Sequence, residues 1–512
     1  MKFTLPDGVF PTVRLSKSHQ EALVDEAETV VSETVAANEA FLAQGAALRS
    51  TKWRLVRVKE GLHVYRRPMT SDGGRGSEPL SPQTHTRTWT ADRARADSGK
   101  RLGSATATVE PLSPSSVAAE NSIQEQMRRP GVSLMLLHGT VDGSLDDSMF
   151  GAFAATDQAW KWRSSHVNDR LDDARILASI RGPSRKDPFR FLGIKWFAKE
   201  HPAVLTGILQ RRDFLIMEAT GLTQDSKGEK VGYFLMHSVA LRAAPELSEM
   251  KIIRGELSFC FILRQSGHGK VELYCRGFTD PRGDMMERVS VAIAAEALIC
   301  AAGVVDYANI KKLTWLMKHK GPGFMTQQRQ SGRDAQSGRC ESCSKSFTTF
   351  ALLAVASGTA TAGKGAACQI CRRVVCAKCS VVKKMTVDVS DTGAVKQCAL
   401  RFCLGCLLEA KEQSAWDMAL KGLEAELESS STTASGSSPS TPRSQFASMA
   451  RRTKHRRDGR TYHSDCRRAD TRVYRQGAMT TDLRRSNNLR QDLCKQHRSS
   501  GNSRSSDRSI PD

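Results

Sequence analysis

The sequence predicts an α+β protein in three parts: an antiparallel sheet that ends in a long helix, a small cysteine-rich module, and a basic tail of low complexity. Three observations support this class. Strand-like runs separated by Gly, Ser and Asp turns recur from 131 to 280. A long apolar helical stretch follows at about 285–318. Four Cys-x2-Cys pairs then lie between 340 and 406. The 512 residues are enough for two to four domains.

The chain is strongly basic. Its 76 Lys and Arg exceed its 54 Asp and Glu by 22, and such an excess favours anionic partners, either membrane surfaces or nucleic acid. Half of the excess lies in 443–512. Pro6 and Pro11 interrupt the start of the chain where a secretory signal would place an apolar run, so we expect no such signal. In a reducing compartment, paired cysteines bind metal more often than they form disulfides.

The first third of the chain alternates between ordered and exposed segments. Residues 1–48 are predicted to be an N-terminal helical segment, with a helix that starts at Ser16 or Ser18. Residues 51–67 are predicted to be a β-hairpin. Residues 68–130 are rich in Ser, Thr, Arg and Pro and are predicted to be largely an exposed insertion.

The central region has the pattern of an antiparallel meander. Its strand candidates are VSLMLLHGTV, ARILASI, RRDFLIMEAT, KVGYFLMHSVAL, GELSFCFIL and KVELYCRGF. A short helix begins after the first of them, capped by Ser144. The long helix at about 285–318 is predicted to stop at Gly321-Pro322 and to be buried against the sheet instead of crossing a membrane.

Hairpin, helix, meander and terminal helix together make the element order of a helix-grip fold, a curved antiparallel sheet wrapped round one amphipathic helix. Residues 49–320 resemble the START-like lipid-transfer family at WRLVRVKEGLHVYRR, RRDFLIMEA and FTDPRGDMMERV. The resemblance implies an apolar tunnel for a hydrophobic ligand, whose burial contributes about 0.8 kcal/mol per CH2. A filled core without a ligand is the alternative. Glu296 on the last helix would either meet a ligand headgroup, pair with an arginine or reach solvent.

The cysteine pairs predict two bound zinc ions. Each Cys-x2-Cys pair places two thiolates on one turn, and a tetrahedral Zn2+ site takes two such pairs. All-cysteine sites leave no open position for a substrate, so we expect both ions to be structural. The predicted ligands are Cys340, Cys343, Cys368, Cys371, Cys376, Cys379, Cys403 and Cys406.

The module, residues 340–408 after a linker at 321–339, resembles a FYVE-type zinc finger. The resemblance rests on the run CQICRRVVCAKC, on Phe347 after the second cysteine, and on Arg401-Phe402-Cys403, which is similar to the family's RVC motif. It implies cross-braced ligation. One ion would be held by Cys340, Cys343, Cys376 and Cys379, and the other by Cys368, Cys371, Cys403 and Cys406. A PHD-like finger or another cross-brace is the alternative, although PHD fingers expect His at position 376; RING fingers fit the central spacing less well.

The FYVE resemblance implies binding to phosphatidylinositol 3-phosphate in an anionic membrane. Here the sequence departs from the family, because the basic motif before the third cysteine lacks its histidines and most of its charge, and the leading WxxD motif is missing. Lys364, Arg373 and Arg401 remain as headgroup candidates, with ordinary surface charge as the alternative. The apolar run 347–355 would either insert into a membrane or pack beneath the finger.

The chain after the finger divides in two. A helix at 409–428 has an apolar face that is a candidate for pairing with a second copy of the chain, giving a homodimer. Residues 429–512 are predicted to be a disordered Ser/Arg-rich tail, within which RRTKHRR at 451–457 could be an import signal, a nucleic-acid patch or a membrane anchor.

Together these features predict a zinc-binding, lipid-binding peripheral membrane adaptor or sensor that is not an enzyme. No GxSxG, P-loop, HExxH or kinase motif is present in the sequence. We expect a cytoplasmic protein at an endosomal or other intracellular membrane, without a nucleic-acid partner. The alternative is a PHD/RING-like protein-interaction module in the nucleus, with a basic tail that binds nucleic acid.

Overall fold

The structure is a computed structural model that describes residues 3–48, 52–67, 122–200, 209–320, 339–346, 366–389 and 395–432. Most of the expected insertion and linker, and nearly all of the expected tail, lie outside these ranges. All of these residues belong to one compact unit, Met1–Met449.

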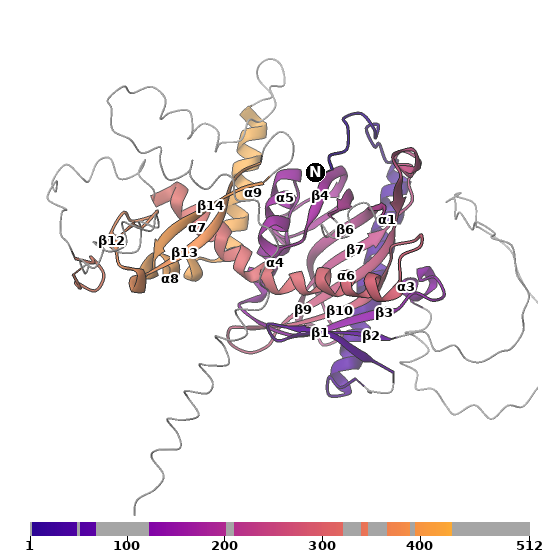
Figure 1. Cartoon of the computed structure of the whole chain (residues 1–512), viewed down its shortest axis with the longest axis horizontal. Coiled ribbons are helices and arrows are strands. Elements are labelled where there is room, and N and C mark those ends of the chain that lie inside the picture. The colour runs from indigo at the N-terminus through magenta and orange to yellow at the C-terminus, as the bar shows by residue number, and fades with distance from the viewer. Residues whose placement is uncertain are drawn as a thin grey trace, which may run out of the picture. The chain divides into compact units, whose positions relative to one another are not determined.

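A ten-stranded sheet forms the centre of the large domain (Figure 1). Nine strands follow one another in the order β1-β2-β3-β10-β9-β7-β6-β5-β4, and every neighbouring pair is antiparallel. The tenth, β8 (Ile252–Arg254), pairs in parallel with β6. The other strands are β1 (Arg54–Lys59), β2 (Leu62–Arg67), β3 (Leu134–Asp142), β4 (Leu171–Arg181), β5 (Phe191–Lys199), β6 (Arg211–Gln224), β7 (Lys230–Ser238), β9 (Glu256–Gln265) and β10 (Lys270–Asp280).

Helices cover both faces of this sheet. The helices of the large domain are α1 (Lys17–Ala43), α3 (Ile123–Met127), α4 (Leu145–Ala152), α5 (Asp157–Val167), α6 (Glu287–Ile299) and α7 (Val304–Lys320). In Figure 1, α6 runs across the strands on one face. Helix α1 lies on the opposite face, where Val30 and Val31 pack with Trp196 and Ile262 from the sheet. This arrangement confirms the predicted α+β class and the helix-grip architecture.

Several helix starts follow the capping rules. The Ser144 hydroxyl accepts a hydrogen bond from the Asp147 N–H at 3.0 Å, as predicted, and Ser16 caps α1 through the N–H of His19 at 3.2 Å. The hairpin of β1 and β2 is also confirmed, with Glu60 and Gly61 at its turn in left-handed conformations.

The long terminal helix is interrupted, contrary to expectation. A 3-10 segment, η3 (Cys300–Gly303), separates α6 from α7. A Cβ atom at Gly303 would lie only 3.3 Å from the Cα of Val167, so the close approach of α5 favours glycine at this point. The stretch Glu287–Lys320 is long and apolar enough to cross a membrane, but Val291, Leu298 and other apolar residues of α6 are buried against the sheet. It therefore matches the predicted buried helix.

The helix expected at about 407–428 is in fact two helices, α8 (Leu404–Glu412) and α9 (Ala415–Thr432). Gln413 is extended between them, and the Ser414 hydroxyl caps the second helix by accepting from the Asp417 N–H at 3.1 Å. Sequence reasoning overlooked this serine cap. It also missed α5 and β5.

A buried charge cluster joins strands β5 and β6 to helix α5. Glu218 on β6 accepts from Lys195 on β5 at 2.7 Å and from both terminal nitrogens of Arg163 on α5 at 3.0 and 3.1 Å. Burial alone would raise the pKa of Glu218, but the two cations hold it below its usual value. Burial lowers the pKa of Lys195 to about 8, and the rings of Trp160 and Phe191 lie 4.7 and 4.6 Å from its ammonium.

Replacing Glu218 by glutamine leaves Lys195 and Arg163 buried without a counter-charge. We expect a loss of about 3–5 kcal/mol in the free energy of unfolding. Denaturant titration measures it, with Glu229→Gln, on the exposed β6–β7 turn, as the control. A loss below about 1 kcal/mol would mean that the cluster is solvated.

Candidate metal centre and lipid-facing interior

Eight cysteine sulfurs lie in two groups of four. One group is Cys340, Cys343, Cys376 and Cys379, and the other is Cys368, Cys371, Cys403 and Cys406; within each group all sulfur atoms lie within 4.8 Å of one another. The grouping alternates along the chain, as the cross-brace resemblance implied. Each group can hold one metal ion.

Tight turns position these sulfurs. In the first pair, the Ser344 N–H donates to the Cys340 carbonyl at 2.7 Å; in the second, the Arg372 N–H donates to the Cys368 carbonyl at 3.1 Å. Ser344 and Arg372 both adopt positive φ, 56° and 64°, which closes each turn. Cys376 precedes the 3-10 segment η6 (Ala377–Cys379).

Short strands and a helix place the remaining cysteines. The strand pair β11 (Ala366–Ala367) and β12 (Val374–Val375) brackets the second turn. The hairpin of β13 (Ser380–Val389) and β14 (Val395–Cys403) delivers Cys403, which caps α8. Cys406 lies one turn into α8.

The donor set fits Zn2+. Backbone N–H groups donate to the sulfurs, from Cys376 to Cys340 at 3.3 Å and from Cys406 to Cys403 at 3.4 Å. The Cys376 N–H is the main reason that the pKa of Cys340 is lowered to about 6, and the hydrogen bond from Cys406 lowers the pKa of Cys368 to about 4. In both groups other sulfurs, those of Cys371, Cys379 and Cys406, have a raised pKa, so the argument for zinc rests on the grouping of four cysteines, the ligand set of a closed structural zinc site.

The three predicted headgroup residues differ in their surroundings. Lys364 lies outside the described residues. Arg373 is exposed, and Arg401 is half-buried on β14, where its Nη1 donates to the Ser380 hydroxyl at 2.8 Å. The apolar run 347–355 also lies outside the described residues.

A third arginine, Arg372, lies directly after Cys371 of the second cysteine group, and sequence reasoning overlooked it. The Gln369 N–H donates to the Arg401 carbonyl at 3.0 Å, and Arg372 Nη1 contacts the Gln369 side-chain oxygen at 3.5 Å. Among the described residues, none of the guanidinium groups of Arg372, Arg373 and Arg401 pairs with a carboxylate. The doublet Arg372-Arg373 directly after Cys371 was the available signal.

The finger shares a hydrophobic core with the large domain. Tyr307, Leu313 and Leu316 from α7 pack in one buried cluster with Met385 and Phe402 from the β13–β14 hairpin. Leu313 and Leu316 are fully buried there. Helix α7 therefore belongs to both parts of the molecule.

Polar contacts reinforce this junction. The His166 Nε2 on α5 lies 2.9 Å from the Thr386 hydroxyl and 3.3 Å from the Thr386 backbone nitrogen, which donates to it. Lys320 pairs with Glu409 on α8. The buried Lys312 ammonium donates to the Lys411 carbonyl at 3.2 Å and pairs with Asp147 at 2.6 Å.

Helix α9 returns to the large domain. Trp416 meets Phe189 edge-on with ring centroids 5.7 Å apart, and the Lys230 ammonium lies 4.8 Å from the Trp416 ring centroid. Part of the apolar face that was considered for dimerisation is thus occupied within the chain.

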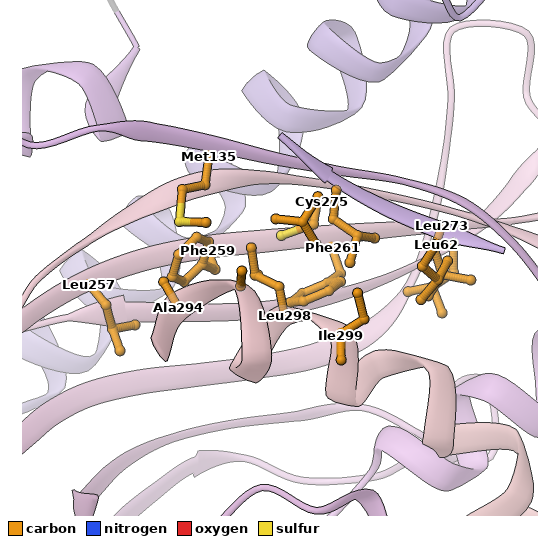
Figure 2. Close-up of a cluster of buried hydrophobic side chains, with 14 of the residues drawn as sticks. Leu62, Met135, Leu257, Phe259, Phe261, Leu273, Cys275, Ala294, Leu298 and Ile299 are labelled. Atoms are coloured by element: carbon orange, nitrogen blue, oxygen red, sulfur yellow. The ribbon is translucent and has the colours of Figure 1, made fainter. Parts of the chain in front are cut away.

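The side chains between the sheet and α6 are apolar. Figure 2 shows Met135, Phe259, Phe261 and Cys275 of the sheet facing Ala294 and Leu298 of α6. Glu296 does not join this interior; it pairs with Arg57 at 2.6 Å and its side chain is about half exposed.

Ser258, His237 and Glu26 form a chain of polar contacts. His237 Nδ1 is 2.8 Å from the Ser258 hydroxyl, and its Nε2 is 3.4 Å from Glu26. Ser258 is fully buried and its hydroxyl also accepts from Gln124 at 3.1 Å, so the group acts as a structural link between α1, α3 and the sheet.

Comparisons with known proteins give structural likeness only. No protein-family model matches the chain, and no curated protein matches it. Among solved structures, the chain is similar to human STARD10 (11% identity, covering 54% of this chain and 80% of that one, TM-score 0.30). It is also similar to human StAR-related lipid transfer protein 5 (13%, 56% and 97%, TM-score 0.33) and to a STAR-related lipid transfer protein from Xanthomonas axonopodis (10%, 50% and 96%, TM-score 0.27). At such low TM-scores, the fold described above rests on its own sheet and helices.

Cys368→Ser should remove one of two bound metal ions and also loosen α7, because the finger and α7 share one core. We expect a lower melting temperature, by at least the ~2–4 °C that 1 kcal/mol produces in a domain of this size. Faster amide exchange should extend into 304–320.

The matched control is Cys398→Ser, since Cys398 on β14 belongs to neither cysteine group. Metal content is measured by elemental analysis of both proteins. Unchanged exchange in α7 after metal loss would contradict the shared core.

Burial lowers the pKa of His166 from 6.5 to about 4, so the fold favours its neutral form. The stability that this histidine contributes is therefore complete above about pH 6.5 and is lost as pH falls through about 4. His166→Gln keeps a hydrogen-bonding group but does not titrate, and should flatten the decline in melting temperature over this range. Acid release of metal affects both proteins alike, so identical pH profiles would rule out the role of His166.

Proposed function

We propose that this protein is a zinc-dependent peripheral membrane adaptor or lipid sensor. Its large domain would bind a hydrophobic ligand between the sheet and α6, and its finger would dock on an anionic membrane. The observation that carries the proposal is the cluster of Arg372, Arg373 and Arg401 beside the second cysteine group, three cations without a carboxylate partner among the described residues.

Cations without a carboxylate partner suit an anionic lipid headgroup; Arg373 is exposed, and Arg372 and Arg401 are half-buried. A guanidinium group binds phosphate in a two-pronged manner, and Arg401 is already held in place by Ser380. Each cation near an anionic membrane contributes about 1 kcal/mol. Rigid placement by a metal-bound turn lowers the entropy cost of binding.

The finger type we propose is FYVE-like, with phosphatidylinositol 3-phosphate as its preferred lipid. Support comes from the alternating cysteine groups and from the hydrogen bond that sets Gln369, at the position of the family's basic motif, against Arg401. The degenerate motif is the reason for proposing weaker binding than that of a complete one.

The proposed ligand of the large domain is a lipid. The side chains beneath α6 are apolar and buried, so an acyl chain inserted among them would remain out of water. We propose no enzymatic activity, a cytoplasmic location at an endosomal or other intracellular membrane, and weak pairing of two copies through the rest of α9.

The test is sedimentation of the zinc-loaded full-length protein with liposomes of phosphatidylcholine alone, with added phosphatidylserine, and with added phosphatidylinositol 3-phosphate. We expect Arg401→Ala and Arg373→Ala each to weaken binding to anionic liposomes roughly fivefold, matching ~1 kcal/mol per cation. Arg401→Lys should recover part of the loss.

Lys227→Ala is the control, because Lys227 is exposed on the β6–β7 turn, outside the finger. Equal binding of all variants would locate the membrane contact elsewhere. Binding to none of the liposomes would favour a protein-interaction role for the finger.

A further inference from the structure

Strand β1 lies at one end of the ten-stranded sheet (Figure 1). Within the part of the chain that the structure describes, only β2 pairs with it, so its other side presents backbone N–H and C=O groups for pairing. The opposite end of the sheet differs. There the Ile176 N–H of β4 donates to Asp157 on α5 at 2.6 Å, and the Asp173 carboxylate accepts from the Leu5 N–H at 3.0 Å. Described segments of the chain thus cover the edge at β4 and leave the edge at β1 open.

A β-bulge sorts the side chains of β1 between the two faces of the sheet. The register shifts between Leu55 and Arg57, so Val56 is the extra residue. Val56 packs against the apolar cluster beneath α6, and Arg57 pairs with Glu296 on that helix at 2.6 Å. Both side chains therefore take the α6 face. Leu55 and Val58, on either side of them, take the opposite face together, whereas a regular strand would separate residues three positions apart.

The face that carries Leu55 and Val58 is apolar and open to solvent. Leu55 is 55% exposed and Val58 is 51% exposed, although both are large apolar residues. Their partners across the strand pair are Tyr65 and His63 of β2, whose rings stack with centroids 6.4 Å apart. Four apolar or aromatic side chains thus share one surface at the end of the sheet.

Helix α1 packs on this same face of the sheet, but further from the edge. Near its end, Phe41 meets Tyr274 on β10 and His138 on β3, with ring centroids 5.4 and 4.9 Å apart. Strands β2 and β1 follow β3 in the sheet, and the helix ends at Ala43. The exposure of Leu55 and Val58 shows that α1 does not shield them.

The α6 face of β1 is basic. It carries Arg54, Arg57 and Lys59. Arg57 has Glu296 as its partner, but Arg54 is exposed and pairs with no carboxylate among the described residues. Two copies of this edge would bring like charges onto neighbouring strands, which is destabilising. A strand that carried carboxylates on this face would instead be attracted.

We propose that β1 binds a partner protein by strand addition, and that the partner segment is an extended peptide in which acidic and apolar residues alternate. Its backbone would pair with the open side of β1. Its apolar side chains would lie beside Leu55 and Val58, and its carboxylates beside Arg54 and Lys59. Because side chains alternate between the faces of a strand, a period of two is the pattern that meets both surfaces.

The exposed apolar pair argues against a purely protective edge. Lys and Arg on an edge strand are a common defence against unwanted pairing, and that defence works best without exposed apolar neighbours. Here the bulge gathers Leu55 and Val58 on one face, where they add apolar contact for an incoming strand. The combination repels a second copy and accepts an acidic strand. The surface lies outside the finger and the interior beneath α6, so this inference is independent of the proposed membrane and lipid binding.

The test is fluorescence anisotropy of a labelled peptide, Asp-Val-Glu-Leu-Asp-Val-Glu-Leu, with the zinc-loaded full-length protein. We expect saturable binding and slower amide exchange in 54–59. Leu55→Ser with Val58→Ser should weaken binding about tenfold, because two cross-strand apolar contacts are lost. Arg54→Glu with Lys59→Glu should weaken it at least as much. A peptide of the same composition with its acidic and apolar residues in separate blocks should bind at least tenfold more weakly.

The matched controls lie elsewhere on the molecule. Leu408→Ser removes an apolar side chain that is 58% exposed on α8, and Lys227→Glu with Lys251→Glu reverses two exposed charges outside β1. Melting temperatures show whether each variant folds. Equal binding of the alternating and block peptides would overturn strand addition, as would slowed exchange only outside 54–59. Binding that ignores both pairs of β1 substitutions, or no binding to the unmodified protein, would overturn the assignment to β1.

Discussion

Helix α7 is the element on which the two halves of the structure depend. Its start closes the large domain through Val305, and Tyr307, Leu313 and Leu316 then complete the core of the finger. A cysteine module of this size buries too little apolar surface to be stable alone, and small domains of this kind are usually held by metal ions. Here the module contains the two candidate metal sites and also packs against α7 of the large domain. Metal binding at the cysteines therefore contributes to the stability of α7 as well.

Local patterns in the sequence predicted local structure well. Ser144 and Ser16 cap helices where the sequence placed them, and the apolar runs on either side of the turn at 265–270 give strands β9 and β10. The alternating cysteine groups came from family resemblance, because spacing alone fixes two sites but not which pairs share an ion. The caps and the strands are set by residues a few positions apart, so the sequence alone reveals them.

Long-range packing was the part that sequence could not reveal. The break at Gly303 depends on the approach of Val167, and His166 meets Thr386 from 220 residues away. Strand β5 was missed, although its neighbour β6, which is also buried on both faces, was predicted. The role of Arg372 was hidden because its neighbour Gln369 is joined to Arg401 only by the fold.

The β13–β14 hairpin reconciles the two tasks proposed for the finger. Successive side chains of a strand point to opposite faces, so Val381 and Phe402 can pack in the core shared with α7 while Val382 and Arg401 take the other face. Val382 is accordingly 52% exposed. Contact with α7 thus leaves the face that carries Arg401 outside the shared core, as the membrane contact proposed for the finger requires.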